Sequence, residues 1–264
     1  HEQHETWVTL RRPVADFAEH NLFNEAKSIQ VDDITDDTAL ERALGQAKPE
    51  AVINCVGLIK QRDEASDETL TLPVNAEFPH RLAKRCGEIG ARLIHFSTDC
   101  VFAGTKGNYT ETDPPDATDL YGQSKHQGEV ADAHSVTLRT SVIGHELATN
   151  LALLDWFLSQ RGQAISGFTK AIYSGFTTLE MARIVDRILT QHPALSGVWH
   201  VASEPISKFA LLQLCREKLG WEGVIEPNDE FVCDRSLNAD RFNQATGYTP
   251  PSWEAMISEL AQQS

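Results

Sequence analysis

Several features that mark particular classes of protein are absent from this sequence. No run of lysine and arginine occurs, and 23 basic residues stand against 38 acidic ones, for a net charge of −15. Because binding to a phosphate backbone needs clustered positive charge, no nucleic-acid partner is expected. The five cysteines are scattered and form no CxxC pair, so the sequence predicts neither a disulfide framework nor a zinc cluster.

Long apolar runs are absent as well. No stretch reaches the length of a membrane span and no signal peptide is recognisable, so we expect no membrane partner and a location in the reducing cytoplasm. His95, His126 and His145 are scattered without the spacing of metal ligands. No catalytic metal is therefore predicted.

What the chain does contain is a regular alternation of apolar runs and helical patterns. Its 264 residues are 41% hydrophobic, which is enough for a sizeable core. The expected strands cover residues 6–10, 28–32, 50–57, 91–98 and 135–144, and the expected helices cover residues 36–47, 73–90 and 121–133. Beyond Gly144 the pattern loosens into helices and loops. Runs that are apolar on both faces indicate an α/β fold, a Rossmann-like doubly wound parallel sheet covered by helices.

Polar side chains gather where ligands of such a sheet bind, beyond the carboxyl ends of the strands. Ser97 and Thr98 directly follow one expected strand. Tyr121 and Lys125 lie four residues apart near the start of the next helix, which places their Cβ atoms about 6 Å apart on one face. An isolated YxxxK would more often be a surface pair. Together, in this order and topology, a hydroxyl, a phenol and an ammonium predict proton-transfer chemistry.

Three stretches carry a family resemblance: FSTDCVFAGTKGNYTETDPPDATDLYGQSKHQGE, LRTSVIG and DRSLNADRFNQATGYTPPSW. They resemble the extended short-chain dehydrogenase/reductase superfamily and, within it, the dTDP-4-dehydrorhamnose reductase family. The resemblance implies a reductase of a nucleotide-linked 4-keto-6-deoxysugar, in the biosynthesis of deoxysugars and cell-surface polysaccharides. It implies NADPH or NADH as cofactor, a small-molecule sugar nucleotide as partner and, where the chain self-associates, a homodimer. Residues 1–145 would form the dinucleotide-binding lobe, and residues 146–264 mainly a smaller substrate-binding lobe of the same domain.

The resemblance also assigns roles to individual residues. It makes Thr98, Tyr121 and Lys125 the catalytic trio. Tyr121 would donate a proton to the developing alkoxide while Thr98 hydrogen-bonds the same oxygen. Lys125 would lower the pKa of Tyr121 by its charge and hydrogen-bond the nicotinamide ribose. Thr98, Asp99 and Arg235 are the residues expected on the substrate side.

The expected cofactor contacts start at the first strand. Arg11 and Arg12 follow it, where arginine suits the 2′-phosphate of NADPH, and a pair of solvated loop arginines is the equally open alternative. By resemblance, Asp33 and Ile34 contact the adenine. The remaining expected contacts are Asn54, Cys55, Val56, Gly57, Ser97, Tyr121 and Lys125.

Other functions remain open at this point. Dehydratases of the superfamily follow the catalytic threonine with Asp-Glu, whereas Thr98 is followed by Asp99 and Cys100, which argues against dehydration. A sugar-nucleotide epimerase needs only the trio, and some relatives are non-catalytic, nucleotide-binding regulatory subunits. The sequence leaves open the sugar, its nucleotide, the stereochemistry of the product and the choice between NADPH and NADH.

One family feature has no counterpart in the sequence. The family opens with a strand and a glycine-rich GxxGxxG turn that holds the pyrophosphate, whereas this chain starts at what should be the second strand. We therefore expect an upstream βα unit of about 20 to 30 residues to be missing. The strands at 6–10 and 50–57 should then flank an empty slot or have moved together. The chain as given should fold poorly and fail to bind dinucleotide.

Overall fold

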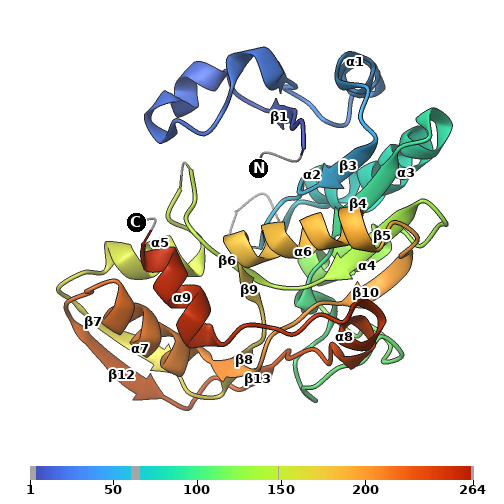
Figure 1. Cartoon of the computed structure of the whole chain (residues 1–264). Coiled ribbons are helices and arrows are strands. Elements are labelled where there is room, and N and C mark those ends of the chain that lie inside the picture. Colours follow the sequence, from blue (N-terminus) through green and yellow to red (C-terminus); the bar gives the residue numbers. More distant parts are fainter. Residues whose placement is uncertain (1–3, 61–65, 148, 263–264) are drawn as a thin grey trace.

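A four-stranded parallel sheet lies at the centre of the protein (Figure 1). The computed structural model describes residues 4–60, 66–147 and 149–262. The strand order is β10-β5-β4-β3, with β3 at Ala51–Asn54, β4 at Arg92–Phe96, β5 at Ser135–Arg139 and β10 at Gly197–His200. The two central strands, β4 and β5, are buried almost throughout, as a parallel sheet covered on both faces requires.

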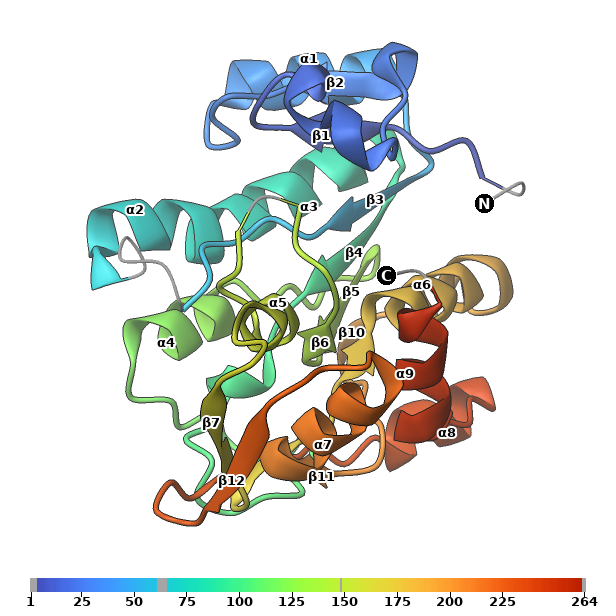
Figure 2. The ribbon, with the colours of Figure 1, turned by 90° about the vertical axis from the view of Figure 1, so that its left-hand side faces the viewer.

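Helices cover both faces of this sheet, as Figure 2 shows from the side. One face carries α2 (Glu68–Leu72), the π-helical segment η4 (Pro73–Glu77), α3 (Phe78–Ile89) and α4 (Leu120–Gln127), and the other carries α6 (Thr178–Gln191). The predicted α/β class with a parallel sheet is confirmed. None of the helices in the described part of the chain combines the length and the apolar character needed to cross a bilayer.

Residues beyond β5 build a second, mixed layer with short strands. Its elements are β6 (Val142–Ile143), α5 (Leu153–Ser159), β7 (Ala164–Phe168), β8 (Ala171–Tyr173), β9 (Phe176–Thr177), β11 (Ile206–Ser207), α7 (Lys208–Lys218), β12 (Val224–Asn228), β13 (Cys233–Asp234), α8 (Asp240–Thr246) and α9 (Trp253–Ala261). Leu138 of the central sheet belongs to the same hydrophobic core as Phe157, Ile184 and Leu211. The main sheet and the C-terminal elements therefore share one core.

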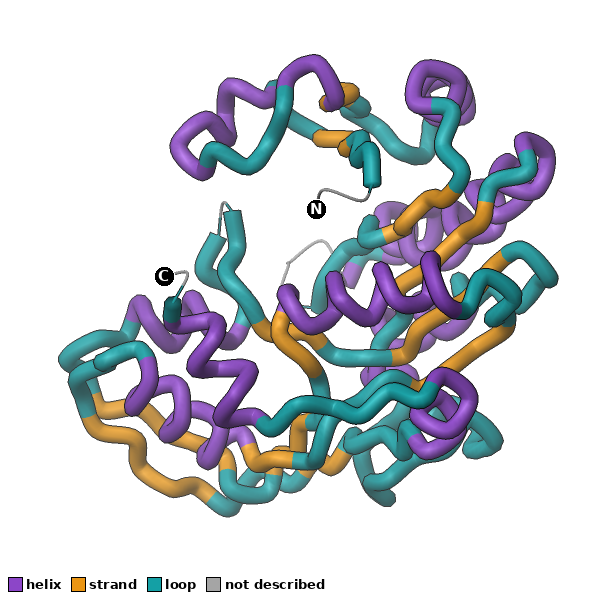
Figure 3. Tube along the Cα trace, viewed as in Figure 1, coloured by secondary structure: helices purple, strands orange, loops and turns teal. Residues whose placement is uncertain are grey.

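The N-terminal elements form a sheet of their own (Figure 3). It consists of β1 (Val8–Leu10) and β2 (Ser28–Gln30), paired in parallel, and the accompanying helices are η1 (Val14–His20), η2 (Glu25–Lys27) and α1 (Asp37–Ala47). In the described residues β1 pairs with β2 alone, and β3 is an edge strand of the main sheet. The strands expected to flank a slot are thus not paired with each other, and they have not moved together.

Several predicted elements needed correction, and the strand expected at 50–57 covers only Ala51–Asn54. The helix expected at 121–133 ends at Gln127, and the next residue, Gly128, packs so closely against η4 that a Cβ there would be 2.0 Å from the Asn75 carbonyl oxygen. After that contact the chain turns away, and the backbone N–H and carbonyl of Val130 bond the Thr137 hydroxyl. The strand expected at 135–144 is likewise divided, into β5 and β6.

The helix predicted at 73–90 is part of a longer helical run. It begins at Glu68, passes through the π-helical segment η4, and ends at Gly90, whose φ of 74° only glycine adopts readily. Pro73 lacks a backbone donor, and its carbonyl accepts from the N–H of Phe78, five residues later. This wider turn carries Asn75 toward α4.

Candidate active site

The threonine and the YxxxK pair occupy two adjoining elements at the carboxyl end of β4. Thr98 caps the short helix η5 (Asp99–Val101): its hydroxyl accepts from the Cys100 N–H at 3.1 Å and donates to the Asp99 carboxylate at 3.2 Å. Tyr121 and Lys125 both lie on α4, as predicted. Asp119 begins this helix by accepting a hydrogen bond from the Gly122 N–H at 2.8 Å.

Two glycines allow α4 to reach these neighbours. A Cβ at Gly122 would lie 2.2 Å from the carbonyl oxygen of Cys100, which belongs to η5. A Cβ at Gly128 would meet the backbone of Asn75 in η4. Glycines before and after Lys125 thus set how closely α4 packs against the elements on either side of it.

Lys125 is buried and points to the end of β4. Its ammonium donates a hydrogen bond to the Phe96 carbonyl at 2.7 Å. A Cβ at Gly57 would be 3.8 Å from the same nitrogen, so the loop after β3 passes directly beside it. Burial lowers the pKa of Lys125 to about 8, against the opposing charge of the Glu129 carboxylate. The amine is therefore still mostly protonated at neutral pH.

The expected effect of Lys125 on Tyr121 is not what the structure gives. Burial raises the pKa of the Tyr121 phenol above its ordinary value, Cys100 and Asp99 add to the rise, and hydrogen bonding with the Thr98 side chain opposes it. The expected lowering of the pKa is therefore wrong for this structure, because desolvation of the phenolate outweighs favourable interactions. A neutral phenol can still act as a proton donor.

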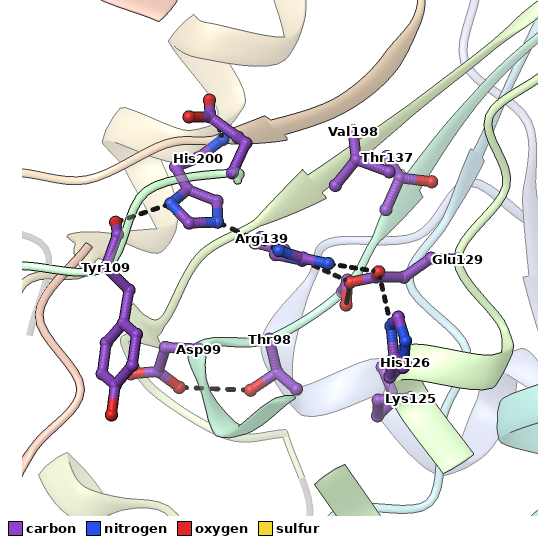
Figure 4. Close-up of polar contacts among 12 residues, drawn as sticks. Thr98, Asp99, Tyr109, Lys125, His126, Glu129, Thr137, Arg139, Val198 and His200 are labelled. Atoms are coloured by element: carbon purple, nitrogen blue, oxygen red, sulfur yellow. Dashed lines mark hydrogen bonds and ion pairs between the residues drawn. The ribbon is translucent and has the colours of Figure 1, made fainter. Parts of the chain in front are cut away.

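A buried polar network connects the end of α4 to the sheet (Figure 4). The Glu129 carboxylate accepts from Nε and Nη2 of Arg139, both at 2.7 Å, and from the Ser97 hydroxyl at 2.8 Å. Its second oxygen is 2.9 Å from Nδ1 of His126. Arg139 in turn lies 3.2 Å from Nε2 of His200 on β10. Glu129 and Arg139 are the centre of this network, and sequence reasoning gave them no role.

A simple signal pointed to this pair. Arg139 lies in the stretch 135–144, which is expected to be a strand of the covered sheet, and every residue of Ser135–Arg139 is buried. A buried arginine needs a carboxylate partner, because an unpaired charge is very costly in the interior. Glu129, just beyond the end of α4, is the carboxylate that pairs with it in the structure.

Asn75 is a second residue that the sequence did not single out. Its side-chain oxygen accepts from the Leu58 N–H at 2.8 Å, and its amide donates to the Leu58 carbonyl at 3.0 Å and to the Ser124 hydroxyl at 3.3 Å. Leu58 lies in the loop after β3 and Ser124 on α4. Asn75 therefore fixes that loop against the helix that carries Tyr121 and Lys125.

The other expected residues of this loop have mainly internal contacts. Asn54 is buried, and its side-chain oxygen accepts from the Val56 N–H at 3.0 Å while its amide lies 3.0 Å from Nδ1 of His95. Cys55 and Gly57 are exposed. The loop after β3 is thus exposed, made of small residues and fixed by the buried Asn54 side chain. Its solvent-facing side is open to a ligand.

Histidines in and near the site have structural partners. His95 bonds Asn54 as described, His126 bonds Glu129, and His145 lies 2.7 Å from the Asp155 carboxylate. Across residues 4–60, 66–147 and 149–262, no group of three or more His, Cys, Asp or Glu side chains is placed to hold a metal ion.

The residues expected on the substrate side are brought together. Arg235 follows β13, and its Nε donates to the Phe102 carbonyl at 2.7 Å, just beyond η5. Asp99 is fully buried and accepts from the Ser141 hydroxyl at 3.0 Å. Burial raises the pKa of the Asp99 carboxyl, against the Ser141 hydrogen bond and the Arg235 charge. The expected grouping of Thr98, Asp99 and Arg235 is thus present, from segments more than 130 residues apart in sequence.

The four residues expected at the adenine end lie in the N-terminal region. Arg11 and Arg12 are exposed, and Arg12 lies 3.8 Å from the Asp16 carboxylate. Asp33 accepts from the Thr35 N–H at 2.8 Å and from its hydroxyl at 2.6 Å, so its carboxylate is occupied within its own turn. Ile34 is half-buried and packs against the small clusters of that region.

Comparison with known proteins identifies the family. A family model described as the RmlD substrate binding domain matches residues 14–264. The chain belongs to this family. The resemblance to dTDP-4-dehydrorhamnose reductases is confirmed: an enzyme of that name from Streptomyces griseus is 38% identical to this RmlD-family chain over 100 residues, which are 38% of the chain and 33% of the relative. The chain thus matches about a third of the length of that relative.

Solved structures share the fold of this RmlD-family chain. The dTDP-4-dehydrorhamnose reductase of Bacillus anthracis, in complex with NADP, has a TM-score of 0.77 at 22% identity, covering 97% of this chain and 98% of that one. The Bordetella bronchiseptica enzyme WbmG, in complex with NAD and UDP, has a TM-score of 0.72 at 20% identity, covering 97% and 92%. These similarities confirm the Rossmann-like architecture.

Proposed function

We propose that this RmlD-family chain acts as a NAD(P)H-dependent reductase of a nucleotide-linked 4-keto-6-deoxysugar, in the biosynthesis of deoxysugars and cell-surface polysaccharides. The observation that carries the proposal is the convergence of Thr98, Tyr121 and Lys125 at the carboxyl end of β4. The matched reductase from Streptomyces griseus supports the substrate class. The five cysteines are all free, which supports the cytoplasm as the location.

The residues around Lys125 fit a nicotinamide dinucleotide. Gly57 is exposed, its missing side chain leaves room beside the Lys125 amine, and the loop that carries it is fixed by Asn75. Solved structures of similar fold are bound to NADP and to NAD, which supports either cofactor. The exposed Arg11 and Arg12 favour NADPH, because its 2′-phosphate offers them an anion to pair with.

The two parts of the chain would bind different ligands. Residues 1–145 would hold the dinucleotide, and residues 146–264 mainly the sugar nucleotide. In the first lobe the proposed contacts are Arg11, Arg12, Asp33, Ile34, Asn54, Cys55, Val56, Gly57, Ser97, Tyr121 and Lys125. When bound, the reduced nicotinamide supplies the hydride.

The side chains of the site have separate tasks. Tyr121 holds its proton firmly, because burial raises its pKa, and gives it up only to the strongly basic alkoxide that forms on the substrate. Thr98 can turn its hydroxyl from Asp99, 3.2 Å away, toward the same oxygen. Lys125 remains the buried cation beside them and binds the ribose. Asp99 and Arg235 orient the sugar.

The proposed function is tested by incubating the full-length protein with NADPH or NADH and a panel of 4-keto-6-deoxysugar nucleotides. We expect oxidation of the cofactor that depends on one of these substrates, with a 4-hydroxy product. Epimerised product without net oxidation would instead indicate an epimerase. Binding of nucleotide without turnover of any substrate would favour a regulatory subunit.

A further inference from the structure

The carboxylate of Glu129 occupies an unusual position for a residue just beyond the end of a helix. Its side chain is only 5% exposed, as is that of Arg139, and the two form a bidentate ion pair. The remaining capacity of the carboxylate is used by the Ser97 hydroxyl and by His126. Buried ion pairs seldom add stability, since desolvation consumes most of the Coulomb energy. The Glu129–Arg139 pair therefore matters more for the segments that it positions than for stability.

The segment held by Glu129 is the end of β4. Ser97, which donates to Glu129, stands between Phe96, whose carbonyl accepts from the Lys125 ammonium, and Thr98. Two hydrogen bonds from neighbouring residues thus connect this segment to the helix α4 and its extension, one through Lys125 and one through Glu129. If one of these two hydrogen bonds is lost, the other alone fixes the position of Thr98 relative to α4.

Glu129 also supplies the main compensating charge for Lys125. The groups that act on the buried amine are the Glu129 carboxylate beyond α4 and Cys55 in the loop after β3. Of these, Glu129 gives the largest support to the ammonium form. The Lys125 charge in turn adds to burial in lowering the pKa of His95 on β4. The Arg139 guanidinium makes two bonds to Glu129 and lies 3.2 Å from Nε2 of His200.

We propose that Glu129 is a positioning residue for the site: it fixes residues 96–98 against α4, and its charge supports the Lys125 ammonium. Arg139 is the counterion that offsets the cost of burying the Glu129 carboxylate. The proposal rests on the proposed function for its catalytic consequence, while the effect on Lys125 itself is independent of any activity.

The test compares three variants of the full-length protein. Glu129→Gln removes the charge but leaves Arg139 unpaired, so it is expected to be strongly destabilised. The double variant Glu129→Gln with Arg139→Met removes both charges and restores a neutral interior. Glu129→Asp keeps the charge but shortens the side chain, so that it cannot reach Ser97 and Arg139 together. Glu180→Gln is the matched control, a buried glutamate on α6 that bonds Arg183 at 2.9 Å and the Tyr248 hydroxyl at 2.7 Å.

The first readout is the ionisation of Lys125, followed by NMR of protein labelled with ¹³C at lysine Cε and assigned with Lys125→Met. We expect a pKa near 8 in the unchanged protein, as burial dictates. The double variant should titrate about one pH unit lower, a tenfold change in the acid dissociation constant, because an opposite charge nearby is gone. Glu129→Asp and Glu180→Gln should stay near the starting value. An unchanged Lys125 titration in a folded double variant would overturn the charge part of the proposal.

The second readout is turnover. We expect Glu129→Asp to lower kcat about fivefold or more with little change in KM, because the residues that act on the reacting oxygen are displaced. In the double variant the alkaline fall in kcat should move to lower pH together with the Lys125 titration. Wild-type kcat in Glu129→Asp would overturn the positioning part, even if the double variant failed to fold. If no sugar nucleotide is turned over by any form, the proposed function fails, while the NMR titration still decides whether Glu129 supports Lys125.

Discussion

Two regions proposed to meet the same cofactor are built in opposite ways. Around α4 every residue of the neighbouring strand β5 is buried, and even the charged Lys125 is only 5% exposed. In the N-terminal region, residues 4–47, the buried residues are Ile29, Val31, Leu40 and Ala43. Arg11 and Arg12 stand exposed there.

The difference reflects what each region has to do. Proton transfer depends on side chains held to within about 0.5 Å, which requires packing and hydrogen bonds from a supporting layer such as Asn75, Glu129 and Arg139. Pairing a phosphate needs only positive charge that can reach it, and exposed arginines on a small scaffold are sufficient. A substitution of given size should therefore change stability or activity strongly near α4 and only weakly near β1.

The largest expected effect is that of a single methyl group at Gly128. Its φ of −83° suits any residue, so Gly128→Ala tests only the close approach to Asn75, whose carbonyl oxygen would be 2.0 Å away. We expect a loss of about 3 kcal/mol or more in the free energy of unfolding, measured by denaturant titration. Gly87→Ala in α3, where a Cβ meets nothing within 4 Å, is the matched control and should not destabilise. Equal stability of the two variants would show that the α4 region is not the tightly packed one.

Next comes the proton donor. Tyr121→Phe should lower kcat at least about a hundredfold, or about 2.7 kcal/mol, because the proton for the reacting oxygen is removed, while affinity for the cofactor stays nearly unchanged. Turnover is followed by cofactor oxidation and affinity by calorimetry. Tyr248→Phe, which removes a hydroxyl bonded to Glu180, is the control and should keep turnover. Near-full activity of Tyr121→Phe would remove the basis of the proposed mechanism.

A smaller effect is expected from the exposed arginines. Replacing Arg11 and Arg12 together with alanine should weaken NADPH about tenfold, or about 1.4 kcal/mol, and NADH hardly at all, since only NADPH has a phosphate to pair with. Dissociation constants of both cofactors are the measurement, and Arg161→Ala, an exposed arginine of the C-terminal part, is the control. Equal losses for the two cofactors would favour solvated loop arginines.

The smallest effect lies within the N-terminal region itself. Gly45 is in the helix α1, and an added Cβ would meet nothing within 4 Å. Gly45→Ala should therefore stabilise the protein slightly, by about 0.5 to 1 kcal/mol through helix propensity alone. Thermal unfolding is the measurement. A loss of stability in Gly45→Ala comparable to that of Gly128→Ala would contradict the contrast between the two regions.

Local patterns predicted much of this protein. The apolar runs at 91–98 and 135–144 gave the central strands, and the YxxxK spacing gave one face of α4. Short strands such as β8 and β13 were not predicted, because two or three residues outside the regular strand–helix alternation carry no periodicity. They form where neighbouring segments supply hydrogen-bond partners, and that information is not local.

The sequence by itself determined which residues could do chemistry: a strand-end threonine and a helical tyrosine and lysine are set by spacing and by order along the sheet. Tertiary structure alone decided how those residues behave. The pKa of Tyr121 rises because distant segments bury it, and the close packing of Gly128 at the end of α4 depends on Asn75 from another helix. Glu129 acquires its role only when Arg139 at the end of β5 and Ser97 just beyond β4 meet it. Periodicity reports on neighbours within a few residues, whereas desolvation and ion pairing depend on contacts that only the folded chain creates.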